Sequence, residues 1–158
     1  MSVDNYSIEG NTISIYFDIK DNIYDIIRDN KLFKKIFKVN RDLLKNYYND
    51  NNKYAYVFKN ITDENIDEYK YISFKTNTVW NDKYNVTITG LNSNKFFDID
   101  DNIEKITIEK LLFNIHKSDN RNVASFKLTF INGEIPMYTK KLIGKILNKC
   151  LTKFKDSI

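Results

Sequence analysis

The chain has 158 residues, of which 42% are hydrophobic and 29% are charged, and its formal net charge is +4. This mixture excludes disordered, collagen-like and coiled-coil classes, and the length is typical of one domain. With one Cys and one His, the chain forms neither an internal disulfide nor any of the usual Cys/His zinc sites. We therefore expect one domain over residues 1–158, without metal or other cofactor.

No apolar run approaches the ~20 residues that span a bilayer. The first ten residues also lack the basic end and the apolar stretch of a signal peptide. These features predict a cytoplasmic protein.

Most of the chain alternates apolar and polar residues, with turn-forming Asn and Asp clusters between the segments. The clearest alternation covers residues 12–20, where four large apolar side chains share one face of a predicted strand. The same period marks segments around Tyr56, Phe74, Val86 and Phe126. Between residues 104 and 117 the phase changes, which predicts a bent strand with a β-bulge near Lys110. These segments predict an antiparallel sheet.

Helical spacing replaces strand spacing in two places. After the first strand, residues 23–27 and 32–37 predict two short helices, with Asp21 accepting hydrogen bonds from the first free amides. Near the C-terminus, Pro136 is suited to a helix start, and an i, i+4 apolar row follows it. The row comprises Tyr138, Leu142, Ile146, Cys150 and Phe154. We expect an α+β fold with this long helix packed across one face of the sheet.

This order of elements resembles the helix-grip superfamily, the START-like or SRPBCC ligand-binding domains. The resemblance covers nearly the whole chain, from TISIYFDIK and DNIYDIIRDNKLFKKIF to GEIPMYTKKLIGKILNKCLTKFK. It implies a curved antiparallel sheet of six to seven strands wrapped around the C-terminal helix. It also implies a cavity between helix and sheet that often holds an apolar molecule, and it transfers no functional residue by identity.

The abundance of aromatic residues favours such a cavity, although aromatic residues at strand spacing first of all form the core. Our main hypothesis is a non-enzymatic domain that binds a lipid-like or other apolar small ligand. The residues expected to line or fill the site are Tyr56, Phe58, Phe74, Trp80, Tyr84, Phe113, Phe126 and Phe130, with Leu142 and Ile146 facing them from the helix.

Two alternatives remain. The cavity is filled by its own side chains and the protein is an interaction module, such as a host or viral accessory protein, that docks through its surface. Alternatively, a few polar groups inside the cavity make the protein an enzyme, for which we nominate no catalytic residue.

Cys150 continues an apolar helix row, so we interpret it as structural rather than as a nucleophile paired with His116. A match of residues 98–109 to a calcium loop fails because Ile103 replaces the required Gly.

The basic excess is concentrated on the predicted C-terminal helix, because residues 134–158 carry the same net charge as the whole chain. Lys141, Lys145 and Lys149 are the candidates for contact with an anionic membrane surface or a protein partner. A solvated helix face is the simpler interpretation. The scarcity of Arg and the modest overall basicity argue against nucleic acid as the partner.

Overall fold

A computed structural model describes residues 5–60, 68–94, 97–133 and 135–158. Within them lie nine strands and three helices, in the order β1–β2–α1–α2–β3–β4–β5–β6–β7–β8–β9–α3. The strands are β1 (Asn5–Glu9), β2 (Thr12–Ile19), β3 (Leu44–Asp50), β4 (Lys53–Asn60), β5 (Glu68–Asp82), β6 (Asn85–Asn92), β7 (Glu104–Lys105), β8 (Ile108–Ser118) and β9 (Arg121–Phe130). The helices are α1 (Ile23–Arg28), α2 (Leu32–Lys38) and α3 (Met137–Ser157).

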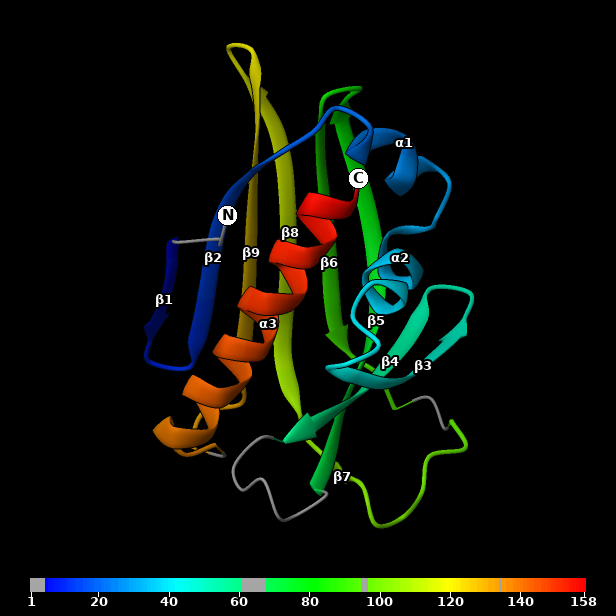
Figure 1. The fold of residues 1–158 in the computed structure, drawn as a ribbon, viewed down its shortest axis with the longest axis vertical. Coiled ribbons are helices and arrows are strands. Elements are labelled where there is room, and N and C mark those ends of the chain that lie inside the picture. The colour runs from blue at the N-terminus through cyan, green and yellow to red at the C-terminus, as the bar shows by residue number, and fades with distance from the viewer. Residues whose placement is uncertain (1–4, 61–67, 95–96, 134) are drawn as a thin grey trace.

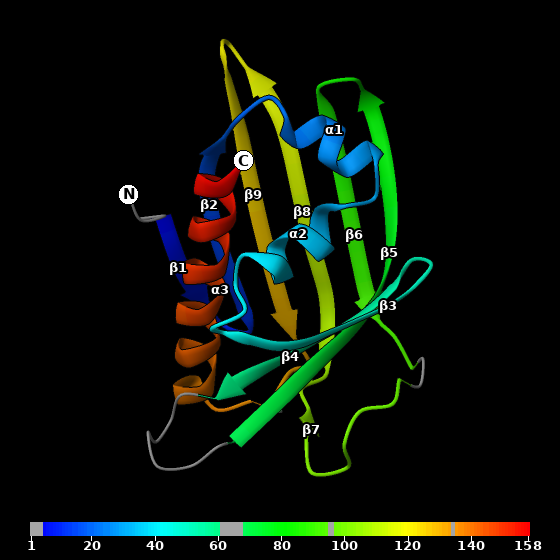
Figure 2. The ribbon, with the colours of Figure 1, turned by 45° about the vertical axis from the view of Figure 1, so that its right-hand side comes forward.

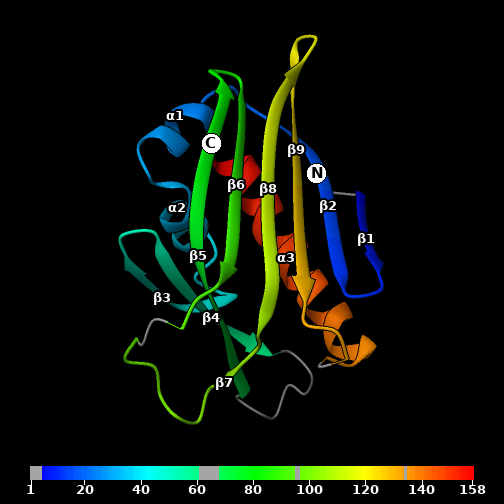
Figure 3. The same ribbon diagram turned by 180° about the vertical axis from the view of Figure 1, so that it is seen from behind.

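The strands form one open sheet in the order β1-β2-β9-β8-β6-β5-β4-β3, with all these neighbours antiparallel. The short β7 pairs in parallel with the start of β5, beside the part of β5 that β6 does not cover. All three helices lie on one face: α3 passes in front of the sheet in Figure 1 and behind it in Figure 3. The predicted α+β class is therefore confirmed, with more strands than the sequence indicates.

Asn and Asp form several of the tight turns. Asn51 between β3 and β4, and Asp119 between β8 and β9, have φ angles of 56° and 57°. This left-handed backbone is tolerated by Asn and Asp better than by most other side chains, because their short polar groups bond to the local backbone. The chain thus makes hairpins with few glycines, as the Asn and Asp clusters indicate.

Local differences from the sequence analysis have physical causes. The predicted bulge is confirmed, since the β8–β9 register shifts between Ile108 and Lys110. The capping role of Asp21 is wrong: no side chain caps α1, and Asp21 instead accepts hydrogen bonds from Asn122 and Lys117. These tertiary donors replace the helix amides as partners of the carboxylate.

The core lies between the inner face of the sheet and the helices. Alternate residues of β2 and β9 are fully buried, among them Ile13, Ile15 and Leu128, while their neighbours Ser14 and Ser125 are only partly buried. Helix α3 contacts β1 and β2 along one side and α2 along the other (Figure 2). This arrangement makes α3 one wall of any space inside the fold.

Candidate functional site

An apolar cavity of about 60 Å³ lies between the middle of α3 and the sheet. Helix α3 contributes Ile143, Ile146, Leu147 and Cys150, and the other walls are Ile36 of α2, Leu44 of β3, Tyr56 and Phe58 of β4, Ile72 of β5 and Leu128 of β9. Six elements that are far apart in the sequence therefore converge on one space.

Local periodicity explains why these side chains face inward. On α3, Ile143, Ile146 and Cys150 follow the i, i+3, i+7 spacing of one helix face, and each is less than a tenth exposed. Tyr56 and Phe58 are two residues apart on β4 and so share a face of the sheet. The helical periodicity of α3 and the strand periodicity of β4 therefore account for the inward orientation of these side chains.

The polar atoms of the cavity lining are neutral. The Tyr56 hydroxyl donates a hydrogen bond to the carbonyl oxygen of Phe33 at 2.5 Å, and complete burial holds its pKa well above the usual value. Burial likewise raises the pKa of the Cys150 thiol to about 12. Neither group is ionised near neutral pH, so the cavity offers contact with apolar groups rather than acid–base chemistry.

Cys150 and His116 do not form a nucleophile–base pair. Cys150 lies in the cavity lining, whereas His116 lies near the end of β8 and its Nδ1 is 3.1 Å from Oδ1 of Asn114. A catalytic thiol needs a base within hydrogen-bond reach to become a thiolate. The structural interpretation of Cys150 therefore agrees with its surroundings.

Aromatic rings fill much of the remaining interior. Phe33 of α2 lies 4.7 Å from the ring of Tyr54 and 5.2 Å from that of Phe74, measured between ring centroids. Phe113 and Phe126 make a second contact of 5.7 Å, edge to face. These rings occupy interior space that would otherwise be open to a ligand.

The structure brings only some of the sequence-predicted residues to the cavity. Tyr56, Phe58 and Ile146 line it. Phe74, Phe113, Phe126 and Phe130 are buried in the core outside the lining, and Leu142 is partly buried on α3. The lining residues not proposed from the sequence are Ile36, Leu44, Ile72, Leu128, Ile143, Leu147 and Cys150. Their apolar strand and helix spacing indicates that they face inward, whereas aromatic type alone does not identify the residues of the lining.

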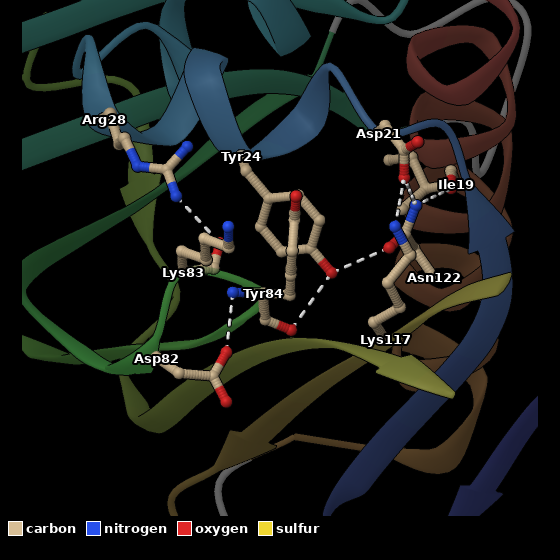
Figure 4. Close-up of polar contacts among 9 residues, drawn as sticks. All are labelled: Ile19, Asp21, Tyr24, Arg28, Asp82, Lys83, Tyr84, Lys117 and Asn122. Atoms are coloured by element: carbon tan, nitrogen blue, oxygen red, sulfur yellow. Dashed lines mark hydrogen bonds and ion pairs between the residues drawn. The ribbon is translucent and has the colours of Figure 1, made fainter. Parts of the chain in front are cut away.

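Trp80 and Tyr84 lie elsewhere, at the β5–β6 hairpin. Both rings contact Tyr24 of α1, with centroid distances of 6.3 Å and 5.4 Å. The Tyr24 hydroxyl donates a hydrogen bond to Oδ1 of Asn122 at 2.8 Å. The amide nitrogen of Asn122 in turn donates to the carboxylate of Asp21 and to the carbonyl oxygen of Ile19 (Figure 4). This network joins α1, two hairpins and the end of β2, and it does not reach the cavity lining.

The three candidate lysines occupy the exposed side of α3. Within the described residues, no carboxylate lies within 4 Å of the ammonium group of Lys141, Lys145 or Lys149. Lys153 instead pairs with Asp42 at 2.5 Å, and the buried Lys140 donates to the Gly10 carbonyl and to Asn11. The two ends of α3 are thus anchored by lysines, and its middle presents uncompensated charge.

Metal-ligating clusters and membrane-spanning helices are both absent from the described part of the chain. No group of three His, Cys, Asp or Glu side chains there is arranged to hold a metal ion. None of the helices described is long and apolar enough to cross a membrane.

Comparison with known proteins shows the fold. No protein-family model matches the sequence, and no curated protein matches it either. Among solved structures, human StAR-related lipid transfer protein 5 superimposes with a TM-score of 0.66 at 5% identity, covering 98% of this chain and 85% of that one. Protein Ms6760 from Mycobacterium smegmatis gives 0.63 at 9% identity, covering 99% and 96%.

Human STARD10 gives a TM-score of 0.64 at 10% identity, with 92% of this chain covering 62% of that chain. This chain therefore spans less than two thirds of that neighbour. Together the matches show that the chain has the helix-grip fold of START-like proteins.

Proposed function

We propose that this protein binds a lipid-like or other apolar small molecule between α3 and the inner face of the sheet. The observation that carries the proposal is the apolar, uncharged cavity at this position. Apolar ligands gain about 25 cal/mol for each Å² of surface removed from water, so such a lining favours them over polar ones. The helix-grip fold supports the proposal, because one of the similar structures is called a lipid transfer protein.

The volume of the cavity sets a condition on binding. At about 60 Å³ it is well below the ~300 to 1,000 Å³ of typical small-molecule sites. A ligand of ordinary size therefore has to move one of the elements that line the cavity. The polar contacts between these elements indicate which one moves. Few polar bonds join α3 to α2 and the turn after it: Asn40 donates to the Cys150 carbonyl at 3.0 Å, and Lys153 pairs with Asp42. We place the opening at this α2–α3 seam.

Two measurements test the proposal. Mass spectrometry of an organic extract of the purified protein detects a ligand retained from expression, and titration with a fluorescent fatty acid measures saturable binding. The variant Ile146→Phe places a ring in the cavity, whereas Met137→Phe changes an exposed residue of the same helix. We expect Ile146→Phe to lower affinity at least about tenfold while Met137→Phe binds like the natural protein. A ligand-free extract together with no saturable binding contradicts the proposal.

One observation favours a second candidate, an interaction module with a filled interior. The side chains leave only about 60 Å³, and on the exposed face of α3 lie three ammonium groups that have no carboxylate partner among the described residues. In this case Lys141, Lys145 and Lys149 contact an anionic surface, and the interior is only a core.

The combined change of these three lysines to Gln separates the two candidates. It leaves stability within about 0.5 kcal/mol for each substitution, because all three side chains are exposed. If the lysines dock the protein, binding to vesicles containing anionic lipid is lost in this variant and weakens at higher salt in the natural protein. Weak binding that responds to neither change means that the lysines are only a solvated face, and binding to nucleic acid instead of vesicles identifies a different partner.

A further inference from the structure

A hydrophilic pocket of about 400 Å³, partly open to solvent, lies where the β3–β4 hairpin and the α1–α2 turn meet β5 (Figure 2). Asn30, hairpin residues 49–54 and β5 residues 76–78 supply its lining, which consists of five asparagines, two threonines and Tyr54. We call it the asparagine pocket. Among the described residues, none lines both this pocket and the apolar cavity. The asparagine pocket is therefore a separate site, and it has the size of a small-molecule site without any movement.

The lining is polar but uncharged. As far as the described residues form it, the asparagine pocket contains side-chain amides and hydroxyls and no ionised group. A charged ligand would lose part of its hydration without gaining an ion pair from the lining. Hydroxyl groups both donate and accept, so they pair with either end of an amide and with another hydroxyl. The lining therefore matches an uncharged ligand that carries several hydroxyl groups.

Two of the amides are held in place by the backbone. Nδ2 of Asn52 donates to the carbonyl oxygen of Thr76 at 2.9 Å, and the Thr76 N–H donates to the carbonyl oxygen of Asn52 at 2.8 Å, which fastens the hairpin to β5. Nδ2 of Asn49 donates to the carbonyl oxygens of Asn51 at 2.8 Å and of Lys53 at 3.2 Å. No described group donates to Oδ1 of Asn49 or Asn52. Each of these two side chains thus keeps one fixed acceptor for a ligand.

Tyr54 contributes a buried ring with a free hydroxyl. The residue is 7% exposed, and its ring lies 4.7 Å from that of Phe33 and 5.7 Å from that of Phe74, between centroids. Among the described residues, no group lies within hydrogen-bond distance of this hydroxyl, whereas the Tyr56 hydroxyl bonds to a carbonyl. The hydroxyl of a buried tyrosine usually has a partner. Burial raises the pKa of Tyr54, which keeps the hydroxyl a neutral donor near neutral pH.

We propose that the asparagine pocket binds an uncharged sugar ring. The Tyr54 hydroxyl donates to one oxygen of the sugar, and two sugar hydroxyls donate to Oδ1 of Asn49 and of Asn52. Acceptors that are already fixed favour a ligand whose hydroxyls are fixed as well, because less conformational freedom is lost on binding. A sugar ring meets this condition better than a linear polyol.

The space beneath the pocket excludes an alkyl chain. A recess of about 30 Å³ continues inward past Tyr54 and Thr78, and its deeper walls are Ile27, Leu32 and Ile88. This volume equals the share of one water molecule in the liquid, so no lipid tail enters through it. A sugar ring bound here therefore belongs either to a free saccharide or to the headgroup of a glycolipid whose tail stays outside the pocket.

Titration of the whole, isotopically labelled protein followed by NMR tests the proposal. The probes are the methyl glycosides of glucose, galactose and mannose, and octyl glucoside below its micelle concentration. We expect at least one of them to cause saturable shifts of the backbone amides at residues 51–54 and 76–78. Cyclohexanol, a ring with a single hydroxyl, should bind at least about tenfold more weakly, because it replaces several hydrogen bonds by one. Shifts with a methyl glycoside identify a free saccharide as sufficient, and shifts with octyl glucoside alone identify a glycolipid headgroup.

Tyr54→Phe removes the free hydroxyl and keeps the buried ring. Because no described group bonds to this hydroxyl, the variant should unfold at the same denaturant midpoint as the natural protein, while its affinity for the sugar falls about fivefold. Tyr16→Phe makes the same change at a residue that is 39% exposed on β2, outside the pocket, and should bind like the natural protein. Thr78→Val removes a second hydroxyl of the lining at an exposed position and should also weaken binding. No saturable shift at residues 51–54 and 76–78 with any glycoside, equal binding of cyclohexanol, or unchanged affinity in both pocket variants overturns the proposal.

Discussion

Replacing Ile146 by Ala enlarges the apolar cavity and tests whether a cavity persists beneath α3 in the folded protein. Ile146 is 6% exposed and lies on α3, facing the cavity. The substitution removes three carbon atoms from the wall without adding a polar group. Because the cavity of about 60 Å³ already borders this side chain, the new space joins an existing one.

The expected loss of stability follows from the burial of the carbon atoms that the substitution removes. Three buried carbons at about 0.8 kcal/mol each give about 2.4 kcal/mol, and the residual cavity adds a further term. We expect Ile146→Ala to lower the free energy of unfolding by about 3 kcal/mol, within the ~2 to 5 kcal/mol seen for such truncations. The enlarged space approaches the ~150 Å³ at which apolar cavities bind benzene or xenon.

Urea unfolding with and without benzene checks both parts of this prediction. Benzene at ten times its dissociation constant should restore about 1.4 kcal/mol to Ile146→Ala. The matched control is Met137→Ala on the same helix, where the side chain is 48% exposed and neither effect is expected beyond about 0.5 kcal/mol. A loss below about 1 kcal/mol, or a full loss without any benzene effect, refutes a persistent cavity beneath α3.

Three other outcomes follow from the contacts of α3. Because burial raises the pKa of Cys150 to about 12, the thiolate fraction at pH 8 is about a thousandfold smaller in the folded than in the urea-unfolded protein, so a thiol reagent should react far more slowly with the folded protein, and fast native reaction would contradict this. A Cβ on Gly144 would collide with the ring of Tyr6, so Gly144→Ala should cost about 1 to 3 kcal/mol, and part of this cost should vanish in a Tyr6→Ala background; strict additivity would count against the contact. The Lys153 ammonium lowers the pKa of Asp42, so their pair contributes stability above the unfolded carboxyl pKa and loses it as pH falls through the folded pKa. Asp42→Asn should therefore destabilise by only about 0.2 to 1 kcal/mol at pH 7, the pair being exposed, and not at all at pH 2.

Strands and helices with one buried face were predictable, and strands without one were not. The alternation of residues 12–20 predicts β2 (Thr12–Ile19), because β2 lies between two strands and buries one face. The edge strand β3 reads LKNYYND, in which only Leu44 is fully buried, so no period of two develops. β7 has two residues and a parallel partner, which leave no pattern in the sequence. The strands that the sequence pattern does not predict are therefore those whose side chains are largely exposed to solvent.

The candidate site was predictable in kind but only partly in membership. Periodicity indicates which face of an element is apolar, and Ile146, Tyr56 and Phe58 were identified in this way. It does not tell whether an aromatic ring lines a space or fills it. Phe74 stacks among other rings, and Tyr84 lies at the far end of β5 and β6. Both placements depend on strand order and register, which arise from long-range pairing.

The two faces of β5 separate the apolar cavity from a second pocket on the outer side of the sheet. Ile72 faces the cavity beneath α3, which has an uncharged lining but needs a wall to move before a ligand of ordinary size fits. Ser73, the next residue, faces the opposite side of the sheet and lines a separate pocket of about 330 Å³ beside residues 97–103. Binding at the inner site should therefore respond to the stability of the α2–α3 seam, whereas changes on the outer face of β5 should not affect it. Because adjacent side chains serve different faces of one sheet, variation at one site leaves the other intact.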